Sequence, residues 1–119
     1  MSEGYLTTHI LDTANGCPAA NVKITLYRLE GETRHDIGGA LTNDDGRTDT
    51  PMIAKGEMQA GEYELVFEIG AYYAARGFEA ALPVFLDHVP VRFGINDAEA
   101  HYHVPLLVSP YGYSTYRGS

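Results

Sequence analysis

Residues 62–69 read Glu-Tyr-Glu-Leu-Val-Phe-Glu-Ile, and this alternation of charged and apolar side chains predicts a β-strand. Side chains two positions apart on a strand point to the same side of the sheet. The side that we expect to face a core carries Tyr63, Leu65, Phe67 and Ile69. The opposite side carries Glu62, Glu64 and Glu68, with Val66 as the exception. Sheets built from such strands bury one face and expose the other.

The same two-residue period recurs at residues 5–11, 22–27 and 89–95, which we also expect to be strands. Residues typical of turns separate the predicted strands, among them Asn15-Gly16, Gly38-Gly39 and Asn43-Asp44-Asp45-Gly46. Turns at this density between short strands are typical of all-β domains.

Only residues 71–76 predict a helix, which Gly77 ends after about two turns. We therefore expect a single domain over residues 1–119. The predicted fold is all-β, an antiparallel β-sandwich of seven to eight strands with one short helix.

Residues 102–108, Tyr-His-Val-Pro-Leu-Leu-Val, depart from the one-sided pattern. Val104, Leu106 and Val108 lie on one side of this predicted strand, and Pro105 and Leu107 lie on the other. A strand that is apolar on both sides is covered on both sides, which in a small sandwich points to another subunit. Because proline has no N–H to donate, Pro105 also predicts a sheet edge or a bulge here.

The 119-residue chain has a net charge of −8, from 16 acidic and 8 basic residues. Nonspecific binding to nucleic acid needs a basic surface, so we expect no nucleic-acid partner. Cys17 is the single cysteine and fits a reducing compartment. We find no secretory signal pattern and no apolar segment of transmembrane length, and therefore expect a cytoplasmic protein without a membrane partner.

Histidines provide the first candidate site residues. His9 lies on the side of its strand opposite Leu6 and Ile10, so it points away from the core, beside Thr7. His101 and His103 are two residues apart and project to the same side of their strand. Each histidine is either a surface residue or part of a site, and the His-x-His spacing also permits metal ligation.

Arg47 and the C-terminal residues provide the other candidates. Arg47 follows the Asn-Asp-Asp-Gly turn, where it either neutralises the aspartates of that turn or serves a site. The chain ends in Tyr116-Arg117-Gly118-Ser119, a composition suited to an ordered terminus that contacts a small polar molecule. No nucleophile elbow, phosphate-binding glycine loop or Cys-x-x-Cys pair occurs, so the residues favour acid–base chemistry by histidines with an arginine.

Three motifs together resemble the transthyretin-like proteins. The first motif comprises Leu6-Thr7-Thr8-His9-Ile10-Leu11-Asp12 and Gly16-Cys17-Pro18-Ala19, and the second is Asp45-Gly46-Arg47. The third runs from His101 to Pro110 and on to Tyr116-Arg117-Gly118-Ser119. The resemblance covers the whole chain in order. The terminal Tyr-Arg-Gly-Ser and His103 are similar to the 5-hydroxyisourate hydrolase branch, and the thyroid-hormone carriers of this family lack both features.

The resemblance implies a prealbumin-like sandwich that assembles into a homotetramer, a dimer of dimers with sites in a channel at the dimer–dimer interface. It also implies a role in urate degradation, within purine metabolism. The small-molecule substrate would be 5-hydroxyisourate, whose cyclic amide is hydrolysed to 2-oxo-4-hydroxy-4-carboxy-5-ureidoimidazoline. No metal or other cofactor is expected for this reaction.

The family's catalytic positions fall on His9, Arg47 and His103, and Tyr116 and Ser119 line the same pocket. The substrate-binding residues implied are thus His9, Arg47, Tyr116 and Ser119. Histidine suits the proton transfers because both of its forms are accessible near neutral pH. His103 is the expected general base on water or on the substrate hydroxyl, while His9 orients the water or relays a proton, although sequence does not separate these two roles. Arg47 is expected to hold the substrate carbonyl and its developing negative charge.

Three other interpretations remain open. A transthyretin-like carrier would bind a small ligand in the same channel without turnover. A zinc protein would use His9, His101 and His103 as ligands. A purely structural sandwich would leave the polar chemistry at the end of the chain unexplained.

Overall fold

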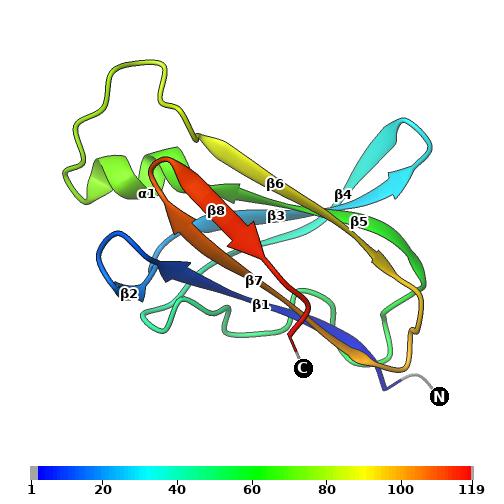
Figure 1. Cartoon of the computed structure of the whole chain (residues 1–119). Coiled ribbons are helices and arrows are strands. Elements are labelled where there is room, and N and C mark those ends of the chain that lie inside the picture. Colours follow the sequence, from blue (N-terminus) through cyan, green and yellow to red (C-terminus); the bar gives the residue numbers. More distant parts are fainter. Residues whose placement is uncertain (1–2, 119) are drawn as a thin grey trace.

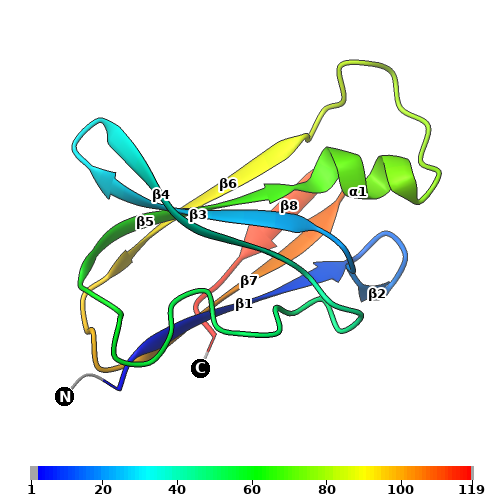
Figure 2. The same cartoon turned by 180° about the vertical axis from the view of Figure 1, so that it is seen from behind.

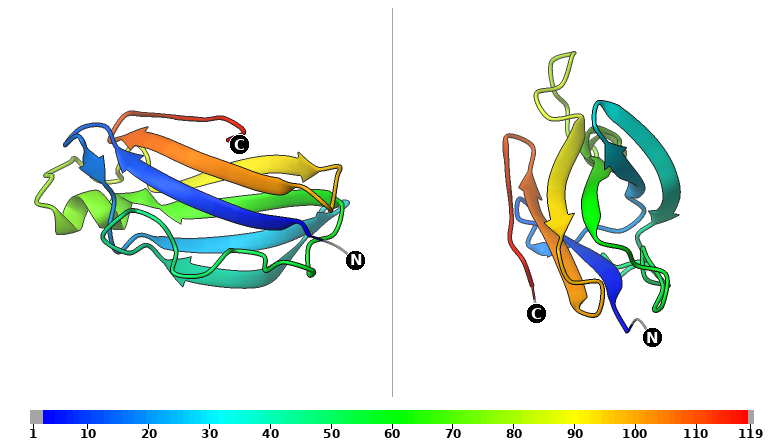
Figure 3. Two further views of the ribbon diagram at one scale, coloured as in Figure 1. Left: turned by 90° about the horizontal axis from the view of Figure 1, so that it is seen from below. Right: turned by 90° about the vertical axis from the view of Figure 1, so that its right-hand side faces the viewer.

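Two four-stranded sheets face each other across an apolar core in the computed structural model, which describes residues 3–118 (Figure 1). The first sheet has the spatial order β2 (Cys17–Pro18), β1 (Tyr5–Asp12), β7 (His101–Ser109) and β8 (Gly112–Thr115). The second sheet has the order β4 (Thr33–Leu41), β3 (Lys23–Glu30), β5 (Gly61–Glu68) and β6 (His88–Ile95). The end-on view in Figure 3 separates the two layers. The predicted β-sandwich is confirmed.

Strands β1 and β7 pair in parallel, whereas every other strand pair in residues 3–118 is antiparallel. Their register runs from Tyr5 opposite His101 to Asp12 opposite Val108. This pairing joins the beginning of the chain to its end in the middle of the first sheet (Figure 2). It also sets the residues of β1 beside those of β7 in a fixed order.

The core between the sheets is formed by the apolar side of each predicted strand. In β1, Leu6 and Ile10 are fully buried, and the alternate residues are partly exposed. The largest fully buried side chains are Tyr63, Phe67, Leu6, Ile10, Ile24, Leu26, Leu65, Ile69, Leu106, Val22, Val89 and Val108. Because burying one such side chain contributes about 1.5–3 kcal/mol, this set supplies the main stabilisation of the sandwich.

The helix α1 (Ile69–Ala75) confirms the one predicted helix, although it begins two residues before the predicted start. Residue Gly77 follows it with φ at 88°, the left-handed conformation that ends helices. Within residues 3–118, no helix combines the length and the apolar character needed to cross a membrane.

The prediction of a turn at Gly38-Gly39 is wrong, because both residues lie within β4. They face β3 next to a register shift at Leu26 and Tyr27, where Ile37 is the extra residue of a β-bulge. Glycine within a strand often marks such a bulge, and sequence alone does not distinguish this from a turn.

The prediction that Pro105 marks a sheet edge or bulge is also wrong, since β7 is paired on both sides. The ladder between β7 and β8 begins at Leu106 opposite Thr115, one residue beyond the proline. The carbonyl of Pro105 accepts a hydrogen bond of 2.7 Å from the Thr115 hydroxyl. The N–H that Pro105 lacks would therefore lie just beyond the end of the β7–β8 ladder.

Glu64 points away from the core as its position in the pattern predicts, yet it is only 3% exposed. Arg34 and Arg92 cover its carboxylate on the outer face of the second sheet, with N–O distances of 2.8 and 2.7 Å. Although burial raises the pKa of Glu64, the hydrogen bonds from the two arginines hold that pKa below its ordinary value. Glu64, which the sequence pattern places on the exposed side of its strand, is thus buried in ion pairs with two arginines.

Asp12 is a fully buried carboxylate that ties α1 to the first sheet. The hydroxyls of Tyr72 and Tyr73 each donate to it at 2.7 Å, and the side-chain amide of Asn15 donates at the same distance. Burial raises the pKa of Asp12, but the hydrogen bonds from Asn15, Tyr72 and Tyr73 outweigh burial and hold the pKa below its usual value. The helix is therefore positioned by polar bonds as well as by packing.

We predict that Asp12→Asn lowers the free energy of unfolding in urea by about 1–3 kcal/mol, because Tyr72 and Tyr73 donate to different carboxylate oxygens and an amide has only one oxygen. A depressed pKa in the folded state stabilises the fold above the unfolded pKa, and this contribution is lost as pH falls through the folded value. The variant should therefore lose less stability than the wild type under acid conditions. Asp44→Asn, at an exposed aspartate, is the control, and equal urea midpoints for both variants would refute the assigned role.

Candidate active site

The candidate histidines lie on the outer face of the first sheet. Thr7 stands opposite His103 in the β1–β7 register, and His9 stands opposite Pro105, two residues farther along. Thr7, His9 and His103 alternate with buried residues of their strands, so their side chains point away from the core. The predicted placement of His9 beside Thr7 is confirmed.

The turn that contains Gly46 brings Arg47 to the same face. The side-chain oxygen of Asn43 accepts a hydrogen bond of 3.2 Å from the Arg47 backbone N–H, and Gly46 adopts φ of 73°. Ile10 donates its N–H to the Gly46 carbonyl at 2.9 Å, and Arg47 then forms an isolated β-bridge with His9. A Cβ on Gly46 would lie 2.5 Å from the carbonyl oxygen of Ile10, so the approach requires glycine.

The C-terminal segment returns along β7 and ends beside His103. The backbone N–H of Gly118 donates to the His103 carbonyl at 2.8 Å. A Cβ on Gly118 would come within 2.6 Å of Cδ2 in the His103 ring. The guanidinium of Arg117 lies over the ring of Tyr102, 4.1 Å from its centroid. The described part of the terminus thus lies against β7, whereas the predicted site residue Ser119 lies outside the described residues.

An open pocket of about 470 Å³ occupies this face, and it is lined by Tyr5, Thr7, Thr8, Arg47, Thr48, His101, His103, Tyr116 and Gly118. Three of the predicted site residues, Arg47, His103 and Tyr116, therefore meet in one pocket. The fourth, His9, lies beside the pocket through its bridge to Arg47 and is not part of the lining.

Burial and the Arg47 charge together favour neutral histidines at this site. Burial lowers the pKa of His9 and the Arg47 charge lowers it further, while a hydrogen bond to the backbone of Asp45 opposes them. Burial also lowers the pKa of His103, with smaller contributions from Arg47, His101 and His9. Within residues 3–118, Arg47 forms no ion pair, so no carboxylate offsets its charge by direct contact. Both histidines can therefore accept a proton near neutral pH.

The hydroxyl of Thr7 connects two histidines in the pocket. Its oxygen lies 2.7 Å from Nε2 of His101 and 2.8 Å from Nδ1 of His103. The ring of Tyr5 stacks on His101 with centroids 4.0 Å apart and planes inclined by 4°, and the Lys55 ammonium lies 5.4 Å from the Tyr5 centroid. Thr7, Tyr5 and Lys55 are not among the site residues expected from the sequence. The available signal for Thr7 was its place two residues before His9 on the same side of the strand.

The zinc interpretation gains no support from the arrangement of side chains. Across residues 3–118, no three His, Cys, Asp or Glu side chains gather as metal ligands do. The rings of His101 and His103 are 6.2 Å apart between centroids, and the Thr7 hydroxyl bonds to both.

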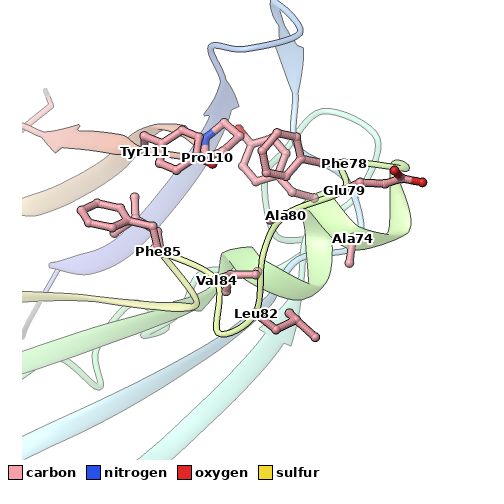
Figure 4. Close-up of a pocket in the computed structure, with 12 residues that line it drawn as sticks. Ala74, Phe78, Glu79, Ala80, Leu82, Val84, Phe85, Pro110 and Tyr111 are labelled. Carbon is pink, nitrogen blue, oxygen red and sulfur yellow. The ribbon is translucent and has the colours of Figure 1, made fainter.

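A second pocket, of about 250 Å³, lies at the opposite end of β7, between the segment after α1 and the β7–β8 turn (Figure 4). Its lining is mainly apolar and includes Ala74, Phe78, Leu82, Val84, Phe85, Pro110 and Tyr111. None of the candidate site residues that the structure describes borders it. The polar pocket is therefore the better candidate for chemistry.

The polar pocket combines two kinds of chemical group. His103 in its lining and His9 beside it, both of lowered pKa, can take up and return protons, and the Arg47 guanidinium can bind a carbonyl oxygen or an anion. Such a set is suited to the hydrolysis of a small polar molecule.

The chain is similar in sequence and in fold to several known proteins. A curated protein of Rhizobium meliloti named 5-hydroxyisourate hydrolase 2 is 59% identical over 116 residues, which are 98% of this chain and 97% of that protein. The crystal structure of an (S)-allantoin synthase matches with a TM-score of 0.93 at 49% identity. That match covers 99% of this chain but 44% of the synthase chain, so this chain spans less than half of that protein.

More distant proteins have the same fold. Sea bream transthyretin, solved in complex with thyroxine, matches with a TM-score of 0.83 at 26% identity, over 95% of this chain and 93% of that one. The model of one protein family, described as Transthyretin: HIUase/Transthyretin family, matches residues 6–118. This chain, with nearly its full length matched, belongs to the HIUase/Transthyretin family.

Proposed function

We propose that this chain is a 5-hydroxyisourate hydrolase of urate catabolism, opening a cyclic amide to form 2-oxo-4-hydroxy-4-carboxy-5-ureidoimidazoline. The observation that carries the proposal is the meeting of Arg47, His103 and Tyr116 in one polar pocket with His9 beside it. The name of the Rhizobium meliloti relative supports the same substrate. The proposed unit is a single domain spanning residues 1–119.

The proposed reaction needs a base, an acid and a stabilised oxyanion. A histidine removes a proton from water, and the water oxygen attacks the amide carbonyl carbon. The carbon–nitrogen bond then breaks, and the leaving nitrogen receives a proton from a protonated histidine. His9 and His103 supply these two transfers, and their lowered pKa values leave the neutral, accepting form available at neutral pH.

Arg47 is the proposed oxyanion partner. Its guanidinium lies in the pocket, keeps its charge at any physiological pH and presents N–H groups in a planar fork. These donors would bind the substrate carbonyl and the negative charge that develops on it. Tyr116 and Ser119 are proposed to contact the substrate beside it.

The open outer face of the first sheet supports assembly into a homotetramer, with sites at the dimer–dimer interface. The pocket lies on this face, and Tyr116 in its lining is 59% exposed in the isolated chain. A second copy on this face would cover the Tyr116 ring and the outer side of β7, and would shield the pocket from bulk solvent. A cytoplasmic location stays a prediction from sequence.

A ligand carrier is the alternative, because the thyroxine-bound sea bream protein has the same fold. The deciding experiment adds this protein to freshly formed urate oxidase product and follows the absorbance of 5-hydroxyisourate. A hydrolase accelerates the decay in proportion to its concentration. A carrier leaves the spontaneous rate unchanged.

We predict that His103→Ala lowers kcat/KM for 5-hydroxyisourate by ~10²–10⁴-fold, the usual contribution of a positioned acid or base. The oligomeric state and the unfolding midpoint should remain those of the wild type, since His103 points away from the core. His88→Ala, at an exposed histidine of β6, is the matched control. Wild-type turnover by His103→Ala would contradict the assignment.

We predict that Arg47→Gln lowers kcat/KM by about 10²–10³-fold and moves the acid limb of the pH profile upward. The upward shift is expected because Arg47 lowers the pKa of His9 and of His103, so losing its charge lets both values rise toward the ordinary value. Activity that needs a neutral histidine is then lost at a higher pH as the solution is acidified.

Arg47→Lys is the matched control, because it keeps the charge and loses the planar fork. Its rate should fall, while its acid limb stays near that of the wild type. Identical acid limbs for the glutamine and lysine variants would show that the Arg47 charge does not act on the histidines.

We predict that Gly118→Ala reduces kcat/KM by at least about tenfold, because the new methyl group meets Cδ2 of His103 and displaces the ring from its catalytic position. Gly112→Ala is the control, since its Cβ would meet its nearest atom at 3.8 Å, an ordinary contact. Steady-state kinetics on both variants, with gel filtration for assembly, make the comparison. Equal activity of the two variants would count against a tight contact between Gly118 and His103.

A further inference from the structure

The hydroxyl of Thr7 has two ring nitrogens within hydrogen-bond distance and only one hydrogen to donate. Nε2 of His101 lies at 2.7 Å and Nδ1 of His103 at 2.8 Å from its oxygen. Both bonds form only if the oxygen accepts from one ring and donates to the other. The positions of the protons on the two histidines are therefore coupled through Thr7.

Two arrangements satisfy this requirement when both rings are neutral. In the first, His101 donates from Nε2, Thr7 donates to Nδ1 of His103, and His103 carries its proton on Nε2. In the second, all donors reverse, and both rings carry their protons on Nδ1. Free neutral histidine prefers the Nε2–H tautomer, so the first arrangement has both rings in their preferred form and the second has neither.

We propose that Thr7 and His101 are positioning residues that hold neutral His103 as its Nε2–H tautomer. The stacking of Tyr5 on His101, at 4.0 Å between ring centroids, fixes the His101 ring, which lies at one end of the hydrogen-bonded series His101–Thr7–His103. At the other end of this series, the close approach of Gly118 fixes the plane of the His103 ring. The hydrogen bonds to Thr7 then decide which nitrogen of His103 is free to meet a ligand.

This arrangement deepens the proposed function by separating the roles of the two histidines. An Nε2–H group on His103 is a donor, suited to the leaving nitrogen of a cyclic amide. The His9 ring has a hydrogen bond to the backbone of Asp45 that favours its protonated form, as a carbonyl acceptor does. In neutral His9 the other ring nitrogen is then an acceptor, suited to taking a proton from water. His9 thus becomes the base, and once protonated by water it returns a proton to the leaving nitrogen, toward which neutral His103 donates a hydrogen bond from Nε2.

The charged and titratable groups around His103 keep it neutral in the resting enzyme. Arg47 lies after the turn that contains Gly46, His9 lies on β1 and His101 lies on β7. Each of them adds to the effect of burial in lowering the pKa of His103. Burial lowers the pKa of His101 in the same direction. The neutral tautomers are therefore the relevant states at neutral pH.

The test reads the tautomer directly, in full-length protein labelled with ¹⁵N at histidine. Ring ¹⁵N shifts are recorded by NMR above the ordinary histidine pKa of about 6.5. For the wild type we expect a protonated Nε2 and an unprotonated Nδ1 on His103. In Thr7→Val, which removes the hydroxyl and keeps the shape, we expect both tautomers to be populated.

Thr7→Ser is the matched variant that keeps the hydroxyl, and it should restore the wild-type shifts. His101→Phe keeps the ring stacked on Tyr5 and removes Nε2, so it should resemble Thr7→Val. We also expect kcat of Thr7→Val to fall by about 10–10²-fold, less than the full contribution of a positioned acid or base, with recovery in Thr7→Ser.

The shift measurement needs no substrate, so it separates this inference from the proposed function. A protonated Nδ1 in the wild type, or unchanged His103 shifts in Thr7→Val, overturns the inference whatever the protein hydrolyses. Expected shifts in a protein that does not accelerate 5-hydroxyisourate decay would support the tautomer assignment and reject the proposed reaction.

Discussion

Strands β1 and β7 pair in parallel along their whole length, and the site depends on the register of that pairing. The register that places Tyr5 opposite His101 also places Thr7 opposite His103. A shift of one residue would turn every outward side chain of one strand into the core. The burial of Leu6, Ile10, Leu106 and Val108 prevents such a shift, so the apolar core holds the polar site in register.

The outer face of the first sheet is unusual in what it carries. An outward sheet face normally meets water with scattered polar groups. Here histidines, threonines and an arginine converge on one pocket, and the C-terminal segment forms part of its wall through the contact of Gly118 with His103. Partial burial and a shared cation lower the pKa of both His9 and His103, which prepares a strand surface for proton transfer.

The two pockets show why fold alone does not define activity. The apolar pocket beside α1 has the features of a binding surface, but its lining holds neither histidine nor arginine. The polar pocket has both, although transthyretin has the same sandwich. The shared fold therefore does not by itself define activity, and the proposed activity rests on the side chains on the outer face of the first sheet.

The sequence by itself determined five of the strands, the short helix and the outward direction of His9, because the periods that mark them are local properties of the chain, whereas β2, β4 and β8 were not predicted. It also identified Arg47, His103 and Tyr116 through resemblance to a family. Local pattern failed at Gly38-Gly39 and at Pro105, where the partner strand decides whether a residue marks a turn, a bulge or the end of a ladder.

Only the tertiary structure decided which polar groups touch. The bonds from Thr7 to His101 and His103 join residues more than ninety positions apart, as does the register of β1 on β7. The burial of Asp12 and Glu64 likewise depends on partners from other elements, the tyrosines of α1 and the arginines of β4 and β6. Such contacts follow from how the elements pack, and no local period of the sequence encodes them.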